Sequence, residues 1–389
     1  MSGSDDFQLG AAKQPAEPSV VEFPAAPGVN RLRSEAADGS ISGDVFVMNA
    51  PPADPVSTDD MENVGLDLAA AMNSNDQEPF HPVVLFGTAN SGKTSLLLSL
   101  FSTLTTQSKL ETGLFLLPPL LGDSSPVGQK LHDEARHTFE LKTQHFIDGQ
   151  KIGKTAVDLP FFIPVEFRPK DRPPVRFAFM ESNGEWYRPD KKGETLFKPL
   201  RRGIETFISR YEGGITFLYL VPYTQSYVDE QADNLDDARQ VSEASLAISG
   251  VLKTYNAIRV AHRDRDNHLM LVSKWDAHNK GDPEQSAADA VDRAELEAFC
   301  SRRHSQALAT FRGMQLREDQ IALNAYCAGV IGQTGLLHAR HDYSVRLWTW
   351  LYKNALRERD QSPVSPFPEK RQTSTVWRMI TSALDKITG

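Results

Sequence analysis

Cysteine is nearly absent from this chain: Cys300 and Cys327 are the only two among 389 residues. Two cysteines cannot supply the disulfide framework of a small secreted protein, so we expect free thiols in a reducing compartment. Cys300 and His304 have a helical spacing that would suit two metal ligands, but the sequence offers no second pair beside them. The scarcity therefore excludes a disulfide-rich class and argues against a structural zinc site.

Long apolar runs are also lacking, because even the run 217–222 is far too short to span a bilayer. The N-terminus has no basic segment leading into an apolar run, which argues against a signal peptide. Acidic residues (51) outnumber basic ones (42), so the basic patch of a nucleic-acid binder is not expected. We expect a cytoplasmic protein with no transmembrane segment and no nucleic-acid partner.

The composition divides the chain into three parts. Residues 1–78 are rich in Pro, Ala, Ser, Asp and Glu, which predicts an acidic, disordered tail; the apolar patch 45–48 is either an isolated strand or a docking motif. Residues 79–358 carry the pattern of a folded domain. Residues 359–389 form a proline-containing linker and an amphipathic helix near 374–387, which either packs on the domain or binds a partner.

Strand and helix patterns alternate through the central part. Apolar runs bounded by turn signals predict strands, at 81–86, 161–167, 175–180, 215–221, 269–272 and 320–327. Helical periodicity predicts helices at 95–101, 127–146, 196–211, 236–262, 288–312 and 343–357. The charged, proline-rich segment 168–174 suits a hairpin connection. This alternation predicts an α/β fold with a doubly wound, mainly parallel sheet.

A phosphate-binding loop is the clearest motif in the sequence. Residues 87–94 read GTANSGKT and fit G-x-x-x-x-G-K-[ST] between a predicted strand and a predicted helix. Gly87 and Gly92 allow the backbone to curl so that amide groups point at one anion, and the helix N-terminus adds partial positive charge. Lys93 would reach the β- and γ-phosphates, and the Thr94 hydroxyl would ligate Mg²⁺. The full set of predicted loop contacts is Gly87, Asn90, Ser91, Gly92, Lys93, Thr94 and Ser95.

Two further polar clusters follow predicted strands. Residues 181–185 read ESNGE after the strand 175–180, and residues 273–276 read SKWD after the strand 269–272. Ligands of doubly wound sheets bind at the carboxyl ends of the parallel strands. Both clusters are therefore expected at the sheet edge that carries the phosphate loop.

Together these motifs resemble the P-loop GTPases of the TRAFAC class. Asn90 is similar to the bacterial subset with G-x-x-N-x-G-K-[ST], Glu181-x-x-Gly184 resembles D-x-x-G with Glu for Asp, and 273–276 resembles [NT]-K-x-D with Ser for Asn. Residues 324–325 faintly resemble the S-A motif. The resemblance covers about residues 80–357, with helical insertions at about 105–155, 223–265 and 277–320. That pattern is most similar to bacterial double-GTPase-type domains of conflict-associated gene clusters.

The resemblance implies roles for residues of the nucleotide site. Asp276 would accept two hydrogen bonds from guanine, Lys274 would lay its stem over the base, and Ala325 would line the base site. Mg²⁺ would be held by Thr94, Glu181 and a mobile threonine. Thr155 is the candidate for that threonine, with Thr138 and Thr143 as rivals.

The resemblance also implies the groups that act on the γ-phosphate. Gly184 would give its N–H to the γ-phosphate, Lys93 would act on the phosphates during hydrolysis, and Glu185 would orient the attacking water. No arginine stands out as an internal finger. We therefore expect slow, Mg²⁺-dependent GTP hydrolysis in a molecular switch that an unidentified protein effector or activator accelerates.

Two alternatives stay open at this stage. An ATPase of another P-loop class would keep Lys93 and Thr94, while Asp276 would be incidental. A nucleotide-binding scaffold without hydrolysis would fit the acidic substitutions Glu181 and Glu185.

Overall fold

The computed structural model describes residues 58–74, 79–121, 126–150, 152, 160–182, 184–187, 202–223, 235–275, 278, 288, 291–331 and 336–367. All of them belong to one unit, Asp54–Gly389. The helices are α1 (Thr58–Asn73), α2 (Lys93–Thr106), α3 (Pro126–His137), α4 (Thr143–Ile147), α5 (Arg202–Arg210), α6 (Leu235–Ile258), α7 (Arg293–Arg303), α8 (Ser305–Arg312) and α9 (His341–Glu358). The predicted patch 45–48 and helix 374–387 lie outside the described residues.

A seven-stranded sheet forms the centre of the unit. Its strands are β1 (Phe80–Phe86), β2 (Thr112–Leu116), β3 (Phe161–Pro169), β4 (Val175–Glu181), β5 (Thr216–Pro222), β6 (Asn267–Ser273) and β7 (Ile321–Ala325), in the order β2-β3-β4-β1-β5-β6-β7. Neighbours from β4 to β7 are parallel, whereas β3 is antiparallel to both β2 and β4. Every residue of β5 and β6 is buried, as expected for parallel strands covered on both faces. The predicted α/β fold with a mainly parallel sheet is confirmed.

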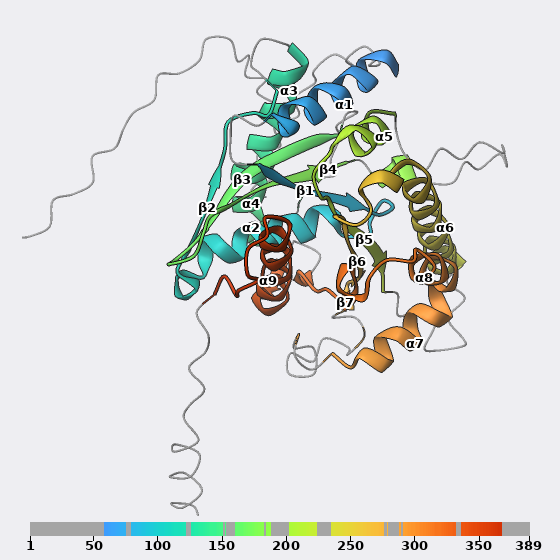
Figure 1. Cartoon of the computed structure of the whole chain (residues 1–389). Coiled ribbons are helices and arrows are strands. Elements are labelled where there is room, and N and C mark those ends of the chain that lie inside the picture. The colour runs from blue at the N-terminus through green and yellow to red at the C-terminus, as the bar shows by residue number, and fades with distance from the viewer. Residues whose placement is uncertain are drawn as a thin grey trace, which may run out of the picture. The chain divides into compact units, whose positions relative to one another are not determined.

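Helices cover both faces of this sheet (Figure 1). The chain moves from β1 towards β3 and β4 through α2, but in the opposite direction from β4 to β5 and from β5 to β6 through α5 and α6. Because crossovers between parallel strands are right-handed, opposite directions place α2 and the pair α5 and α6 on opposite faces. The last long helix, α9, lies with α2, and the Trp348 Nε1–H donates to the Leu100 carbonyl at 3.0 Å.

Helix α1 corrects part of the prediction for residues 1–78, because its 16 residues are ordered against α5. Val64 and Leu68 are buried four positions apart on its inner face. Gly65 crosses Gly203 so closely that an added Cβ at Gly65 would lie 2.3 Å from the Gly203 oxygen. The composition of the whole segment hid this short apolar stripe, since proline and acidic residues dominate the average.

Three other elements differ from the sequence-based expectation. The edge strand β2 lies where only loop and helix signals were expected, and all of its residues are partly or fully exposed because it pairs on one side only. The expected helix 288–312 is two helices, α7 and α8, separated at His304, whose ring is fully buried with Nε2 3.2 Å from the Pro222 oxygen. A short hairpin of β8 (Gly329–Ile331) and β9 (Leu336–Ala339) follows β7. Each depends on tertiary contacts that local periodicity does not report.

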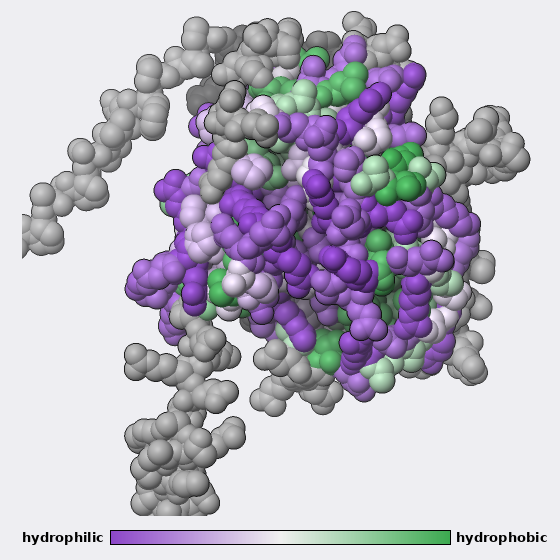
Figure 2. Space-filling model, viewed as in Figure 1, coloured by the Kyte–Doolittle hydropathy of each residue, from purple (hydrophilic) through white to green (hydrophobic). Residues whose placement is uncertain are grey.

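The described surface is mostly hydrophilic, with small separate apolar patches on the face shown in Figure 2. Val260, at 66% exposure, is the most exposed of the large hydrophobic side chains that the structure describes. Among the described helices, none combines the length and apolarity needed to cross a bilayer.

Two buried histidines make the fold sensitive to acid. Burial lowers the pKa of His268 to about 3, with Arg263 and Arg259 adding to the effect, and burial lowers the pKa of His304 to about 4. At pH 5 the folded protein keeps both neutral, whereas the unfolded chain, with pKa about 6.5, binds the protons. Stability therefore falls as the pH drops below about 6.5, by about 2 kcal/mol per histidine between pH 7 and pH 5.

Urea unfolding at these two pH values tests this linkage. In the wild type the free energy of unfolding should fall between pH 7 and pH 5. In His268→Gln we expect this fall to be smaller by about 2 kcal/mol, whatever the substitution costs at pH 7. His137 is exposed on α3, so His137→Gln should keep the wild-type drop. Equal drops in the wild type and His268→Gln would contradict the assignment.

Candidate nucleotide-binding site

The loop between β1 and α2 has the geometry of a phosphate cradle. Asn90 and Gly92 adopt left-handed conformations, with φ of 63° and 91°. The loop turns tightly, since the Ser91 nitrogen donates to the Thr88 oxygen at 3.2 Å. An added Cβ at Gly87 would lie 2.3 Å from Ser91 Oγ. Helix α2 starts directly at Lys93 after Gly92, so its first N–H groups face the turn, where an anion is favoured.

Lys93 is held inside this loop rather than extended into solvent. Its side chain is only 6% exposed. Its Nζ donates to the carbonyl oxygen of Gly87 at 2.6 Å and to that of Thr88 at 3.3 Å. The ammonium is thus held inside the loop by two backbone carbonyl oxygens.

Thr94 and Glu181 come together from two neighbouring parallel strands. Thr94 lies in the first turn of α2 after β1, and Glu181 is the last residue of β4, which pairs with β1. The Thr94 hydroxyl donates to Glu181 Oε1 at 3.1 Å, and Glu181 is 1% exposed. A hydroxyl beside a carboxylate is the type of oxygen donor set that suits Mg²⁺. Within the described residues no cluster of three or more His, Cys, Asp or Glu occurs, so phosphate and water oxygens would have to complete such a site.

Gly184 lies directly against the phosphate loop. It begins a short 3₁₀ helix, η3 (Gly184–Tyr187), just after β4. An added Cβ there would lie 2.5 Å from the Ala89 nitrogen and 2.7 Å from the Thr88 carbonyl carbon. Only glycine permits this approach, because backbone atoms cannot yield as a flexible side chain can.

The segment after β6 also contacts the loop. The Ser273 hydroxyl donates to the Ser91 oxygen at 2.6 Å. Lys274 follows in a left-handed conformation, with φ of 60°, and its side chain is exposed. Ala325 ends β7 in register with Val272 of β6. The first predicted base-site residues therefore lie at the same sheet edge as the phosphate loop.

Some predicted site residues are not brought to this edge or cannot be placed. Thr138 and Thr143 are buried on the helix that packs against α2, and Thr143 Oγ1 donates to the Thr138 oxygen at 3.2 Å. Because both side chains are buried there, neither Thr138 nor Thr143 fits the role of the mobile threonine. Thr155 and Asp276 lie outside the described residues, as does the side chain of Glu185, whose backbone belongs to η3.

The structure also places Ser95 and Arg202. Ser95 is partly buried in the first turn of α2. Arg202, an arginine that follows Gly184 in the sequence, forms an ion pair with Glu62 of α1 at 2.7 Å. This pairing directs it to α1 rather than to the loop.

Sequence reasoning missed Tyr187, which lies beside the phosphate loop. Tyr187 is 1% exposed, and the centroid of its ring lies 5.8 Å from Lys93 Nζ. Its hydroxyl lies 2.9 Å from Ser182 Oγ. The spacing of Gly184 and Tyr187 could have indicated this position. Residues three apart lie on the same side of a 3₁₀ helix, which has three residues per turn.

A buried hydroxyl cluster behind the loop was also missed. The Tyr326 hydroxyl contacts Ser99 of α2 and lies 2.9 Å from Ser344 of α9. Burial raises the pKa of Tyr326 well above its usual value, so the hydroxyl stays neutral. The main-chain carbonyl oxygen of Tyr326 accepts from the main-chain N–H of Trp275 at 3.3 Å, which links Tyr326 to the segment after β6.

A strand, a glycine-containing loop holding a lysine, and a helix in this arrangement define a P-loop α/β protein. No protein-family model and no curated protein matches the chain.

Several solved structures are similar to it at low identity. The signal recognition particle receptor SRb-GTP/SRX complex from Chaetomium thermophilum is 13% identical over 66% of this chain and 94% of that chain, with a TM-score of 0.33. Toc33 from Arabidopsis thaliana in complex with GDP and Mg²⁺ is 12% identical over 77% and 93%, with a TM-score of 0.33. The S. cerevisiae Ski7 GTPase-like domain bound to GTP is 13% identical over 64% and 42%, with a TM-score of 0.30. TM-scores of this size carry no argument about function, which has to come from the residues of the site.

Proposed function

We propose that this chain is a cytoplasmic, bacterial GTP-binding protein that hydrolyses GTP slowly in the presence of Mg²⁺ and acts as a molecular switch. The observation that carries the proposal is the contact of Thr94 Oγ1 with Glu181 Oε1 at 3.1 Å beside Lys93 held in its loop. This arrangement combines a cation for phosphates with an oxygen donor pair for Mg²⁺.

The switch part of the proposal is supported by Gly184. Its backbone touches the loop at Thr88 and Ala89, close to where the last phosphate of a triphosphate would lie. A backbone N–H of this segment would bind the γ-phosphate and lose that partner after hydrolysis. The segment that starts at Gly184 would then be released, and an unidentified effector or activator would respond to the change.

The preference for guanine is supported by the Ser273 bond to Ser91 at 2.6 Å. That bond fixes the start of segment 273–276 at the phosphate loop. Asp276, which the resemblance assigns to guanine recognition, remains part of the proposal. A carboxylate that lost the two guanine donors would disfavour adenine, because an unpaired charged acceptor is costly.

A bound Mg²⁺ would supply positive charge that stabilises the phosphates during hydrolysis. Thr94 and Glu181 would hold it, together with Thr155 as proposed from the sequence. Lys93 would keep the phosphates in place, and Glu185 would orient the attacking water.

Equilibrium binding of fluorescent GTP and ATP, each with and without Mg²⁺, tests the proposal on the wild-type chain. We expect a preference for GTP that depends on Mg²⁺. A preference for ATP would move the chain to another P-loop class. Binding to neither nucleotide would contradict the function altogether, and GTP binding without phosphate release over many hours would favour a scaffold.

Replacing Asp276 with Asn should change the base that the protein prefers. The amide can donate to the oxygen of xanthine at the position where guanine has an amine, so we expect affinity to shift from GTP to xanthosine triphosphate by at least about tenfold in the ratio. Competition binding with the two nucleotides measures this ratio. An unchanged ratio would exclude Asp276 from base recognition while leaving phosphate binding intact. Asp319 lies in the short helix before β7, so Asp319→Asn serves as the matched control.

A further inference from the structure

Tyr187 contacts the lysine of the phosphate loop from a position just after the motif residues 181–185. Its ring centroid lies 5.8 Å from Lys93 Nζ, within the range of a cation–π contact. The ring is almost fully buried and packs edge-on against Phe86 at 5.6 Å. Water is therefore largely excluded from the contact, and a desolvated cation–π contact is stronger than an exposed one.

The backbone of η3 joins this contact to Gly184. Gly184 and Tyr187 are three positions apart in a 3₁₀ helix, so they lie on the same side, one turn apart. Gly184 touches Thr88 and Ala89 of the loop, and Tyr187 reaches Lys93. The ring therefore meets the ammonium only while the whole segment lies on the loop.

Ser182 contacts the hydroxyl of Tyr187 and so helps to orient the ring. Its Oγ lies 2.9 Å from the Tyr187 hydroxyl, and it is 2% exposed directly after β4. Phe86 lies at the end of β1, on the strand next to β4. Tyr187 is thus oriented by both strands that carry the phosphate and metal residues.

We propose that Tyr187 is a positioning residue through which Lys93 distinguishes a nucleoside triphosphate from a diphosphate. This inference rests on the proposed function. A γ-phosphate bound by Gly184 keeps η3 on the loop, and the Tyr187 ring then holds Lys93 towards the β- and γ-phosphates. A diphosphate offers Gly184 no such anchor, so Lys93 binds it without the ring.

Binding of β,γ-imido GTP and of GDP to Tyr187→Leu tests the proposal. We expect the affinity for β,γ-imido GTP to fall about three- to thirtyfold, the range of a partly to fully desolvated cation–π contact. The affinity for GDP should change less than about threefold. The ratio of the two affinities is the deciding quantity, because a purely structural role would weaken both nucleotides together.

Three comparisons make the result specific. Tyr187→Phe keeps the ring and should restore the wild-type ratio; a Phe variant that behaves like Leu would assign the effect to the hydroxyl and overturn the proposal. Tyr211→Leu removes an equally buried ring whose hydroxyl bonds to Phe80 at the opposite end of β1, so it should leave the ratio unchanged. Melting temperatures show whether each variant is folded. If Tyr187→Leu is misfolded, Tyr187→Met replaces it, because the flexible methionine side chain fills gaps better.

The outcomes separate this inference from the proposed function. If the wild type binds neither nucleotide, the function itself fails and the inference fails with it. If the wild type binds β,γ-imido GTP but Tyr187→Leu keeps the wild-type ratio, only the role of Tyr187 is overturned.

Discussion

Replacing Lys93 with alanine will lower the affinity for GTP by at least about a hundredfold, because charge-assisted hydrogen bonds to two phosphates are lost together. The structure gives the reason for so large an effect. Lys93 is 6% exposed and is already held by the Gly87 and Thr88 oxygens. Little conformational entropy is therefore spent when a phosphate meets the ammonium. Fluorescent-nucleotide titration in the presence of Mg²⁺ measures the loss.

A second lysine provides the control for this substitution. Lys253 is exposed on α6, so Lys253→Ala removes the same charge from a different surface and should change the affinity less than about twofold. Thermal unfolding without nucleotide shows whether Lys93→Ala is still folded. If folded Lys93→Ala binds GTP as tightly as the wild type, nucleotide binding does not use this loop and the proposed function is wrong.

The phosphate loop was predictable because its conformation depends on a few consecutive residues. Glycines at 87 and 92, with a lysine and a threonine after them, fix the turn and the start of α2 locally. The expected strand 81–86 is confirmed, and the expected helix 95–101 lies within α2, which begins earlier, at Lys93. The mainly parallel character of the sheet also follows from the sequence pattern, since fully apolar runs alternate with helices.

Contacts between distant segments could not be read in the same way. Tyr187 and Lys93 meet because β4 pairs with β1, and no local pattern marks that meeting. Helix α1 was missed because its apolar stripe matters only when α5 lies beneath it. The roles of Thr155, Asp276 and Glu185 stay predictions, because neither a contact nor a distance places their side chains.

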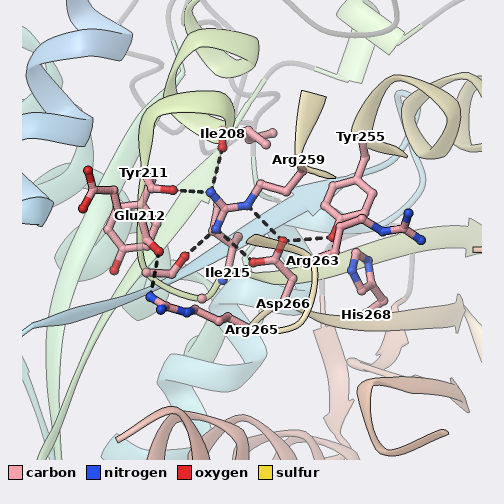
Figure 3. Close-up of polar contacts among 12 residues, drawn as sticks. Ile208, Tyr211, Glu212, Ile215, Tyr255, Arg259, Arg263, Arg265, Asp266 and His268 are labelled. Carbon is pink, nitrogen blue, oxygen red and sulfur yellow. Dashed lines mark hydrogen bonds and ion pairs between the residues drawn. The ribbon is translucent and has the colours of Figure 1, made fainter. Parts of the chain in front are cut away.

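A buried ion pair at the other end of the sheet was equally invisible in the sequence (Figure 3). Arg259, after α6, donates through Nε and one terminal nitrogen to the two carboxylate oxygens of Asp266 at 2.9 and 3.0 Å. Both side chains are completely buried. Asp266 also accepts from the Ile215 nitrogen and from the Tyr255 hydroxyl, each at 2.9 Å. Burial raises the pKa of Asp266, and the Arg259 guanidinium opposes that effect.

Arg259 also holds the backbone at the end of α5. Its guanidinium donates to the carbonyl oxygens of Ile208, Tyr211 and Gly213, around the end of α5 and the start of the next loop. The Arg259–Asp266 ion pair therefore links α5 and α6 to the residues that directly precede β5 and β6. An apolar replacement of both partners would leave these carbonyls and the Ile215 nitrogen buried without donors or acceptors, which is costly.

Replacing Asp266 with alanine should lower the free energy of unfolding by about 3–5 kcal/mol, because it leaves the Arg259 charge buried and uncompensated. Arg259→Met should cost at least as much, since it removes the partner of Asp266 and the donors of three carbonyls. Urea unfolding at pH 7 measures both.

An exposed arginine–carboxylate pair serves as a control that shows how much of the expected loss of stability is due to burial rather than to charge alone. Arg136 and Glu140 are 3.0 Å apart on the surface, with 63% and 53% of their side chains exposed, so Glu140→Ala should cost less than about 1 kcal/mol. The double variant Arg259→Met with Asp266→Leu provides the sharper comparison. If buried charge alone were the problem, the double variant would recover most of the wild-type stability, as buried pairs replaced by apolar residues often do. We expect it to stay destabilised, because the backbone groups around Arg259 would still lack partners; full recovery would contradict the role assigned to these carbonyls.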